Sequence, residues 1–544
     1  MHLISGRRPG KNMQQKISLK LLPAQAADDI EIQKNIAAYL NKQKSAVKGF
    51  TIIKKSIDAR GQKVYINLTV NAFIDEPFEE KSQANWKFQD VTHATKSVII
   101  IGSGPAGIFA ALMLLEKGIK PIILERGKEV RARRRDLAAL NKEGIVNPES
   151  NYCFGEGGAG TYSDGKLYTR SNKRGNIDRI LQLFVHFGAP ENIASDAHPH
   201  IGTNKLPQII TAMHEQIKNC GGEVHFEKKV IDFIIEKEKI QSVKTADGNL
   251  FSAFAYILAT GHSARDIFEL LHQKKIMIEA KPFAMGVRIE HPQSLIDSIQ
   301  YHCNTERDIH LPPAAYSLVQ QVNGRGVFSF CMCPGGIIAP AATDAGELVV
   351  NGWSPSKRNN PFANSGIVVQ VEKENALKSL RREKIIIDES DPLVFMKFQR
   401  LIEQKAFAAG GGNFAAPAQR MQDFVQNKLS ASLPKNSYLP GLTSVKLETV
   451  LPAFIYEALS KAFQDFGKKM PARNGNESYY TNEAVIVAVE SRTSSPVRIP
   501  RNDDNLQHPQ LTNLYPCGEG AGYAGGIVSA AMDGERVANE IAAV

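Results

Sequence analysis

Cysteine is scarce in this chain, and its spacing fits none of the frameworks that cysteine usually builds. The 544 residues include only six, at positions 153, 220, 303, 331, 333 and 517. A disulfide-stabilised secreted domain needs a denser pattern, and a structural zinc site or a common dithiol oxidoreductase needs CxxC pairs. These classes are excluded. No metal site is predicted either: His198 and His200 are two residues apart, and no cysteine lies near them in the sequence.

A secretory signal and a membrane span are also missing. The first apolar residues are interrupted by Arg7, Arg8 and Lys11, with no hydrophobic segment behind them, so a cytoplasmic protein is expected. The uncharged run at 98–115 just reaches the length of a bilayer span. However, it begins with three glycines and a proline, which would leave backbone groups unsatisfied in lipid. No membrane span is therefore predicted.

A chain of 544 residues is too long to fold around one ordinary hydrophobic core, so two or three domains are expected. Residues 1–95 have the pattern of a small α+β domain, with strands over 16–22, 50–57 and 64–73 and a helix over 28–41. This segment has 15 Lys and Arg against 9 Asp and Glu, which is more than half of the chain's net charge of +10. A basic module of this kind could bind RNA, but it lacks the aromatic residues that single-strand binders stack on bases. Nucleic acid is therefore disfavoured as a partner, and docking or dimerisation is favoured.

The most informative stretch is 97–127, SVIIIGSGPAGIFAALMLLEKGIKPIILERG, which has the order strand, glycine turn, helix, strand and acid. Its glycines have the GxGxxG spacing, which permits a tight turn, close approach of a diphosphate and close packing of helix on strand. The helix N-terminus favours the diphosphate, and the acid after the second strand favours a ribose without a 2′-phosphate, so NADP is disfavoured here. The predicted cofactor-binding residues of this stretch are Gly102, Ser103, Gly104, Pro105, Ala106, Gly107, Glu125 and Arg126.

Residues 128–167 add an arginine-rich helix and a glycine-rich loop. Arg131, Arg133, Arg134 and Arg135 lie on an amphipathic helix, where they would either neutralise a diphosphate or substrate carboxylate or form a solvated face. The loop 151–167 repeats the GxGxxG spacing but has no buried strand before it. It is therefore interpreted as a loop that packs against a flat ring or phosphates. The loop residues predicted to bind the cofactor are Gly158, Gly165 and Lys166, and Val230 is expected beside the adenine.

Two later segments return the chain to the same site. A buried strand ends at Thr260 and Gly261, before a helix with an SxxD capping box at Ser263 and Asp266. Near the C-terminus a strand, an acid, a glycine turn and a helix follow one another. The acid would accept hydrogen bonds from ribityl hydroxyls, and the helix N-terminus would favour an anionic reduced flavin. The residues predicted there are Gly518, Glu519, Gly525, Gly526 and Ile527.

Residues 281–484 have a different, β-rich pattern. A hairpin is expected across NGRG, between strands at 315–322 and 327–332. On the second strand Cys331 and Cys333 are two apart, so both side chains would face one way with Cα atoms about 6.6 Å apart. They are either a thiol pair facing the flavin or small buried core residues. After this segment, SRTSSPVRIPR at 491–501 could line a site for an anionic substrate.

Residues 96–280 and 485–544 resemble, by their motifs, the flavoproteins of the glutathione-reductase superfamily, which contain two dinucleotide-binding domains. FSFCMCPGG, the segment PFAMGVRIEHPQ at 282–293 and the front domain resemble more closely the bacterial NAD(FAD)-utilising dehydrogenase family. The resemblance implies that the fingerprint glycines meet the FAD diphosphate, Glu125 the adenosine ribose, Thr260 and Gly261 the inner face of the site, and Glu519 the ribityl chain. Glu519 departs from the aspartate usual in the superfamily. The redox CxxC and a second fingerprint for NAD(P)H are absent, so the resemblance implies FAD but no particular reaction.

We therefore expect an α/β fold with a Rossmann-like FAD-binding domain assembled from discontinuous segments. The expected units are a small N-terminal α+β domain (1–95), the FAD-binding domain (96–280 and 485–544) and an inserted β-rich α+β substrate or cap domain (281–484). The expected function is an FAD-dependent oxidoreductase that transfers hydride through flavin N5 to or from a small molecule, with NAD(P)H as a transient donor if one is used. The alternatives are a flavin-dependent RNA-modifying enzyme and a non-catalytic flavin redox sensor. Catalytic residues, substrate and oligomeric state are left open.

Overall fold

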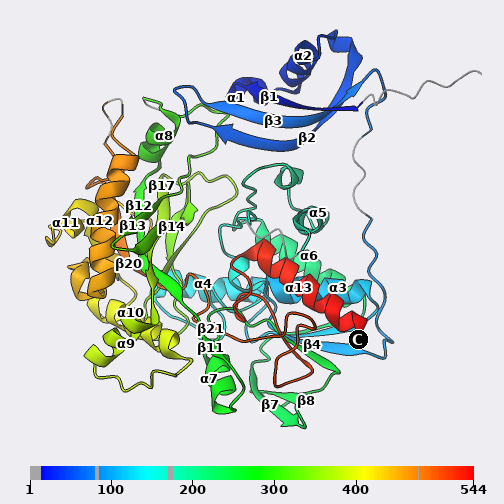
Figure 1. Ribbon diagram of the computed structural model, residues 1–544, viewed down its shortest axis with the longest axis vertical. Helices are drawn as coiled ribbons and strands as arrows, with labels where there is room; N and C mark the ends of the chain where they lie inside the picture. Colours follow the sequence, from blue (N-terminus) through cyan, green and yellow to red (C-terminus); the bar gives the residue numbers. More distant parts are fainter. Residues whose placement is uncertain (1–13, 80–84, 170–174, 305, 474, 476) are drawn as a thin grey trace, which may run out of the picture.

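The structure is a computed structural model that describes residues 14–79, 85–169, 175–304, 306–473, 475 and 477–544. Figure 1 shows a small N-terminal sheet set apart at one end, above a body that contains a parallel sheet and a larger, mainly antiparallel sheet. Within the described residues, no helix combines the length and the apolar character needed to cross a bilayer.

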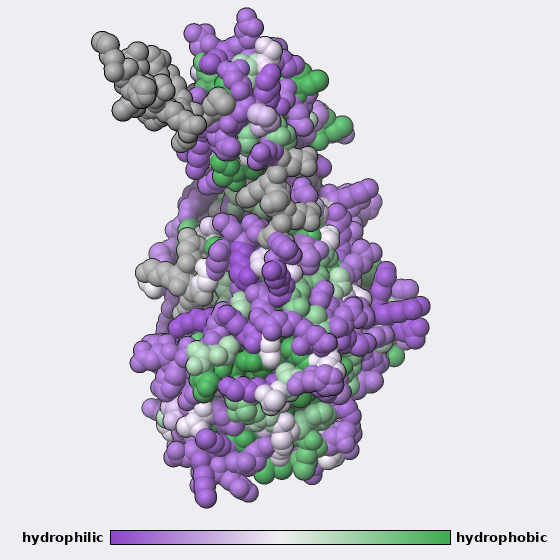
Figure 2. All heavy atoms as spheres, turned by 90° about the vertical axis from the view of Figure 1, so that its right-hand side faces the viewer, coloured by the Kyte–Doolittle hydropathy of each residue, from purple (hydrophilic) through white to green (hydrophobic). Residues whose placement is uncertain are grey.

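The N-terminal unit is the predicted βαββ module. Its strands are β1 (Gln14–Leu21), β2 (Val47–Asp58) and β3 (Tyr65–Ile74), in the order β1-β3-β2, and its helices are α1 (Pro23–Ala26) and α2 (Asp29–Tyr39). Helix α2 begins after Asp28, whose carboxylate accepts a hydrogen bond from the Ile30 N–H at 2.8 Å. Backbone hydrogen bonds of 2.9 Å from Lys55 to Ser195 and from Ala197 to Lys55 join the unit to the body. Its surface in Figure 2 is mostly hydrophilic.

The dinucleotide-type sheet is parallel and is assembled from both ends of the body. Its order is β22-β10-β4-β5-β6, and its strands are β4 (Ser97–Ile101), β5 (Lys120–Leu124), β6 (Glu223–His225), β10 (Ala255–Leu258) and β22 (Leu514–Pro516). The helices around it are α3 (Pro105–Glu116), α4 (Val130–Glu143), α5 (Ile177–His186), α6 (Leu206–Asn219), α7 (Arg265–Gln273) and α13 (Ile527–Ala543). A small sheet is formed by β7 (Val230–Glu236), β8 (Lys239–Thr245) and β9 (Leu250–Phe251). Helix α13 lies beside α3, and Gly534 permits this contact because a Cβ there would collide with the carbonyl oxygen of Ala106 (Figure 1).

The inserted segment forms a seven-stranded sheet with helices packed against it. Its order is β13-β14-β17-β12-β20-β18-β19, with β12 (Phe283–Pro292), β13 (Val319–Val322), β14 (Arg325–Cys333), β17 (Phe362–Val371), β18 (Ala416–Arg420), β19 (Leu442–Ser444) and β20 (Val485–Glu490). The helices are α8 (Gln293–Tyr301), α9 (Lys373–Arg382), α10 (Val394–Ala409), α11 (Met421–Val425) and α12 (Ala453–Lys469). Two short pairs complete it, β11 (Glu279–Ala280) with β21 (Val497–Arg498) and β15 (Ile337–Pro340) with β16 (Val350–Trp353). The expected hairpin across NGRG is the β13–β14 pair.

The expected fold class is confirmed: a discontinuous parallel sheet carries the dinucleotide-type unit, and a β-rich segment is inserted into it. The four domain ranges stay a prediction. Strand β20 pairs with β12 and β18 of the inserted sheet, so sheet membership would move the third boundary from before Val485 to after Glu490. The first strand that returns to the parallel sheet is β22.

Candidate functional site

A cavity of about 360 Å³ opens where β4, β5, β10 and β22 end, at the carboxyl edge of the parallel sheet. Ligands of open parallel sheets bind at this edge. The structure brings nearly all the predicted cofactor residues into its wall. They are Gly102, Gly104, Pro105, Ala106, Glu125, Arg126, Gly158, Gly165, Lys166, Val230, Thr260, Gly261, Gly518, Glu519, Gly525, Gly526 and Ile527.

The two remaining predicted residues, Ser103 and Gly107, lie behind the wall and support the turn. Ser103 is buried, and its N–H and hydroxyl donate to Glu125 Oε2 at 2.9 and 3.2 Å. A Cβ on Gly107 would collide with the carbonyl oxygen of Gly102, so this glycine permits the close contact between α3 and the turn. Gly102 has φ +105°, a conformation that other residues rarely adopt.

Glu125 ties three backbone segments together at the end of β5. Its Oε1 accepts hydrogen bonds from the N–H groups of Gly127 (2.8 Å) and Gly155 (2.9 Å), and its Oε2 accepts from Ser103. The carboxylate is buried, and its position in the cavity wall is fixed by these donors. The proposed contact with a ribose stays a prediction.

The wall beside Glu125 contains an ion-pair network. Arg126 donates to Glu149 Oε2 at 2.7 Å and to Asp266 Oδ1 at 2.9 Å, and its guanidinium lies 4.0 Å from the ring centroid of Phe154. Lys229 also pairs with Asp266, at 3.2 Å. The predicted capping box is therefore wrong, because Asp266 is engaged by cations and α7 begins after Ala264 without a side-chain cap.

The arginine-rich helix is α4, and neither interpretation of it holds for Arg133. Its side chain is fully buried and donates to the carbonyl oxygens of Asn151 (2.8 Å), Tyr152 (3.0 Å), Glu156 (2.7 Å) and Gly158 (2.8 Å). It therefore braces the loop 151–160 from behind. The remaining arginines, Arg131, Arg134 and Arg135, are exposed, as a solvated face requires.

The backbone around the cavity fits a dinucleotide that carries a diphosphate. Gly104 precedes α3 and Gly526 precedes α13, so two helix N-termini border the same space. A Cβ added to Gly104, Gly261, Gly525 or Gly526 would meet no protein atom within 4 Å. Because all four glycines line the cavity, a side chain at any of them would occupy space that is now open to a ligand. The residues present therefore fit FAD.

A cluster of charged groups and sulfurs lies at the end of the cavity where Lys166 meets β14. Lys166 Nζ is 3.4 Å from Asp164 Oδ2, 3.6 Å from Cys331 Sγ and 3.5 Å from Cys333 Sγ. Although burial opposes ionisation of Asp164, Lys166 and Arg358 lower its pKa to about 2. Burial likewise opposes the charge on Lys166, but Asp164 and the two sulfurs raise its pKa above the ordinary value. This end of the cavity therefore holds a fixed ammonium.

Glu519 lines the same cavity. Burial raises its pKa to about 7, a shift that nearby Lys281 only partly opposes. Near neutral pH this carboxyl group is divided between its ionised and protonated forms, so it can accept or donate a hydrogen bond.

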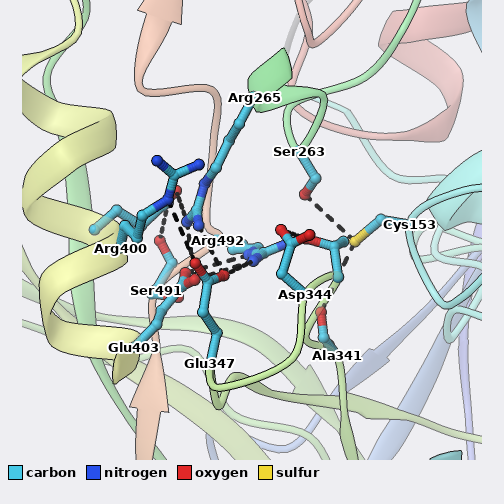
Figure 3. Close-up of polar contacts among 12 residues, drawn as sticks. Cys153, Ser263, Arg265, Ala341, Asp344, Glu347, Arg400, Glu403, Ser491 and Arg492 are labelled. Atoms are coloured by element: carbon cyan, nitrogen blue, oxygen red, sulfur yellow. Dashed lines mark hydrogen bonds and ion pairs between the residues drawn. The ribbon is translucent and has the colours of Figure 1, made fainter. Parts of the chain in front are cut away.

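A buried ion cluster adjoins a second, smaller pocket of about 40 Å³, which shares Cys153, Ala159, Ser163 and His262 with the main cavity. In Figure 3, Arg265 of α7 and Arg492 lie on either side of Glu347 and Glu403. The Arg265 guanidinium nitrogens lie 2.8 Å from a carboxylate oxygen of each glutamate. Arg492 Nη2 lies 3.3 Å from Glu347 Oε2 and 3.0 Å from Glu403 Oε2. Burial and the neighbouring Glu403 raise the pKa of Glu347 to about 7.

This pairing removes two of the three arginines at 491–501 from the expected anion site, and the expectation for the rest of that segment stays a prediction. Arg492 is held by two carboxylates, and Arg501 pairs with Asp533 at 2.6 and 3.0 Å. Both guanidinium groups are neutralised within the chain, so they are not available to an anionic substrate. An anionic substrate stays a prediction, and these two arginines do not support it.

Asp164 and Phe330 were not predicted as parts of the site, and Arg133, predicted as a diphosphate or carboxylate partner or a solvated residue, instead braces the loop from behind. Asp164 had a signal, since it lies two residues before Lys166 in the same glycine-rich loop. Phe330, which lines the cavity from β14, had only an indirect signal: its neighbour Cys331 belongs to the pair that was considered as facing the flavin. No group of three His, Cys, Asp or Glu side chains suited to a metal occurs in the described ranges.

Comparisons with known proteins agree with this geometry. A family described as pyridine nucleotide-disulphide oxidoreductase matches residues 96–270, and one described as FAD-dependent protein, C-terminal domain-like, matches residues 282–493. A domain family of unknown function matches residues 13–73. An uncharacterized protein of Clostridium beijerinckii is 39% identical over 537 residues, which cover 94% of this chain and 96% of the relative.

Among solved structures, CtdE in complex with FAD is 10% identical, with a TM-score of 0.31 and coverage of 82% of this chain and 84% of that one. The open conformation of a flavocytochrome c3 fumarate reductase is 10% identical, with a TM-score of 0.30 and coverage of 86% and 83%. The relative spans nearly the whole chain, and the family matches cover both the fingerprint and the inserted sheet. The chain therefore belongs to a family of FAD-dependent oxidoreductases.

Proposed function

We propose that FAD lies along the cavity, with its adenosine near Glu125 and Val230 and its isoalloxazine ring near Lys166 and Phe330, and that hydride passes between flavin N5 and a small organic molecule. The observation that carries this proposal is the set of four cavity glycines whose missing side chains leave space for a ligand. FAD supplies a carrier of two electrons, and the chain supplies orientation and charge.

The placement of the diphosphate follows from the helix termini. Helices α3 and α13 both begin at the cavity, so their free N–H groups and positive dipole ends favour negative charge between them. Gly104 and Gly526 let the diphosphate approach the backbone, as in other dinucleotide folds. The fixed carboxylate of Glu125 is then a suitable acceptor for ribose hydroxyls.

The ring end differs chemically from the adenosine end. The Lys166 ammonium, held by Asp164, favours the negative charge that a two-electron reduced ring carries. Glu519 offers a carboxyl group to the ribityl chain in either protonation state. A substrate would enter next to the ring, where the cavity meets the smaller pocket near Ser163 and His262.

A matched pair of glycine variants tests the binding mode. Gly104→Ala and Gly61→Ala both add a methyl group that would meet no protein atom within 4 Å, and neither glycine has positive φ. Only the first methyl group projects into the cavity. Overpacking of about 1–3 kcal/mol should weaken FAD binding by about 5- to 160-fold in Gly104→Ala and leave Gly61→Ala like the wild type. Binding is measured by titrating stripped protein with FAD. Wild-type protein that is purified colourless and binds no added FAD would contradict the proposal.

The hydride donor is tested by mixing FAD-loaded protein with NADH or NADPH without oxygen. Bleaching of the flavin absorbance by one nucleotide would identify it as a donor that binds transiently against the ring. Unchanged absorbance with both would remove NAD(P)H from the proposal and leave the organic substrate as the source of hydride.

A further inference from the structure

Two cysteines lie at the ring end of the cavity in an irregular part of β14. Cys331 lines the cavity and has φ +47°, at the point where the pairing of β14 with β17 shifts between Phe330 and Cys333. A left-handed conformation in a residue other than glycine costs about 1–3 kcal/mol and is typical of functional sites. Cys333 Sγ is only 3.2 Å from the carbonyl oxygen of Cys331, so the second thiol folds back toward its neighbour.

Positive charge surrounds these sulfurs. The Lys166 ammonium is within 3.6 Å of both sulfurs, and Arg288, which is fully buried, donates to the Cys331 carbonyl oxygen at 3.3 Å. The cations of the cluster are Lys166, Arg288 and Arg358. The carboxylates that pair with them are Asp164 and Glu490. Three cations face two carboxylates, and Glu519 with its neighbour Lys281 adds one group of each sign. A thiolate at Cys331 would therefore balance the charge.

The two thiols are also unequal. Hydrogen bonding from Cys333, together with Lys166 and Arg288, lowers the pKa of Cys331 well below its ordinary value. Burial raises the pKa of Cys333. A reactive thiolate beside a protonated second thiol is the arrangement that thiol–disulfide chemistry requires.

We propose that Cys331 and Cys333 form a redox-active pair that exchanges two electrons with FAD in the adjoining cavity. In the oxidising direction the Cys333 S–H bond breaks and an S–S bond forms with the Cys331 thiolate. Two electrons and one proton pass to the oxidised flavin, which becomes its anionic reduced form. The step balances without another reactant, and it rests on the proposed function for its flavin.

A reductive titration tests the pair on the FAD-loaded chain. Oxidised wild-type protein should take up two electrons per chain more than its flavin requires, because the disulfide is a two-electron couple. Cys331→Ser and Cys333→Ser should each lose that extra uptake. Cys303→Ser, which changes a cysteine outside the cavity wall, should keep it. Equal uptake by wild type and Cys331→Ser would overturn the proposal.

Two further readouts do not depend on turnover. Blocking free thiols before digestion should leave residues 331 and 333 unlabelled in oxidised wild-type protein and labelled after reduction, as read by peptide mass. Labelling in both states would overturn the proposal. In Cys333→Ser the remaining thiolate should give a long-wavelength absorbance band with oxidised flavin. The absence of that band would place Cys331 away from the ring and would also overturn it. Failure of wild type to bind FAD is detected separately and would reject the proposed function, whatever the thiol state.

Discussion

Replacing Arg133 by methionine tests whether a buried guanidinium holds the glycine-rich wall of the flavin cavity. The Arg133 side chain donates four hydrogen bonds to backbone carbonyl oxygens of residues 151–158. Methionine keeps much of the side-chain volume but has no donor, so these carbonyl groups would lose their partner. Gly158, at the end of this loop, lies against Gly104 at the start of α3. The substitution should therefore affect both stability and FAD binding.

The expected loss of stability follows from the number of hydrogen bonds. At about 1 kcal/mol for each of the four, the free energy of unfolding should fall by about 4 kcal/mol. Water entering the loop would satisfy some of the carbonyl groups and reduce the loss, whereas the charge of the native donor increases the strength of each bond. A fall of about 3–5 kcal/mol is therefore expected for Arg133→Met.

The measurement is urea unfolding at saturating FAD, with flavin fluorescence reporting release of the cofactor. Arg134→Met is the matched control, because it removes the same charge from an exposed neighbour on α4. It should shift the midpoint little, since exposed charges contribute about 0–1 kcal/mol. Equal midpoints for the two variants would show that the Arg133 hydrogen bonds do not stabilise the loop.

Three other changes probe the buried charges. Burial raises the pKa of Glu290 to about 7. The folded state therefore holds a proton that the unfolded state releases above about pH 4.5. As pH rises from about 4.5 to about 7, the free energy of unfolding of the wild type should fall by about 3 kcal/mol relative to that of Glu290→Gln. Urea unfolding at several pH values measures this difference. Parallel pH curves for the two proteins would refute this. Arg492→Met leaves two buried glutamates short of a cation and should destabilise the chain by about 3–5 kcal/mol, seen as a lower urea midpoint. Lys166→Gln removes the cation beside Cys331, so the pH midpoint for alkylation of that thiol should rise. An unchanged midpoint would show that Lys166 does not stabilise the thiolate.

The sequence predicted the nucleotide end of the site because its signals are local. The turn at 102–107, the acid at the end of β5 and the glycines before α13 each follow from a short pattern with one physical cause. Their convergence also follows, since parallel strands present their carboxyl ends at one edge. The Arg133 contacts were not predictable in this way. A single arginine in a row of arginines differs from its neighbours only in the direction that its side chain takes on α4.

The domain boundary near 485 shows a second limit. Strand β20 is a fully buried and mostly apolar segment, and a strand of this kind would fit either the parallel sheet or the inserted sheet. Only the pairing of β20 with β12 and β18 assigns it to the inserted sheet. Hydrophobic periodicity reports how deeply a strand is buried but not which strands are its neighbours, so a boundary between two buried sheets cannot be read from it.

The charge balance near Lys166 gives a second reason, besides their position at the cavity, to connect the two cysteines with the proposed flavin. While both sulfurs are reduced, the Cys331 thiolate neutralises the excess cation beside Lys166. Forming the S–S bond removes that negative charge from sulfur, and the proposed two-electron transfer would place one on a flavin ring bound, as proposed, beside the same ammonium. The buried cluster then has the same net charge before and after the step, so neither redox state leaves an unpaired charge in a medium of low dielectric constant. Because Lys166→Gln removes the cation common to both states, it should weaken both the thiolate and the anionic reduced flavin, whereas a lysine that served only one of them would change one property and spare the other.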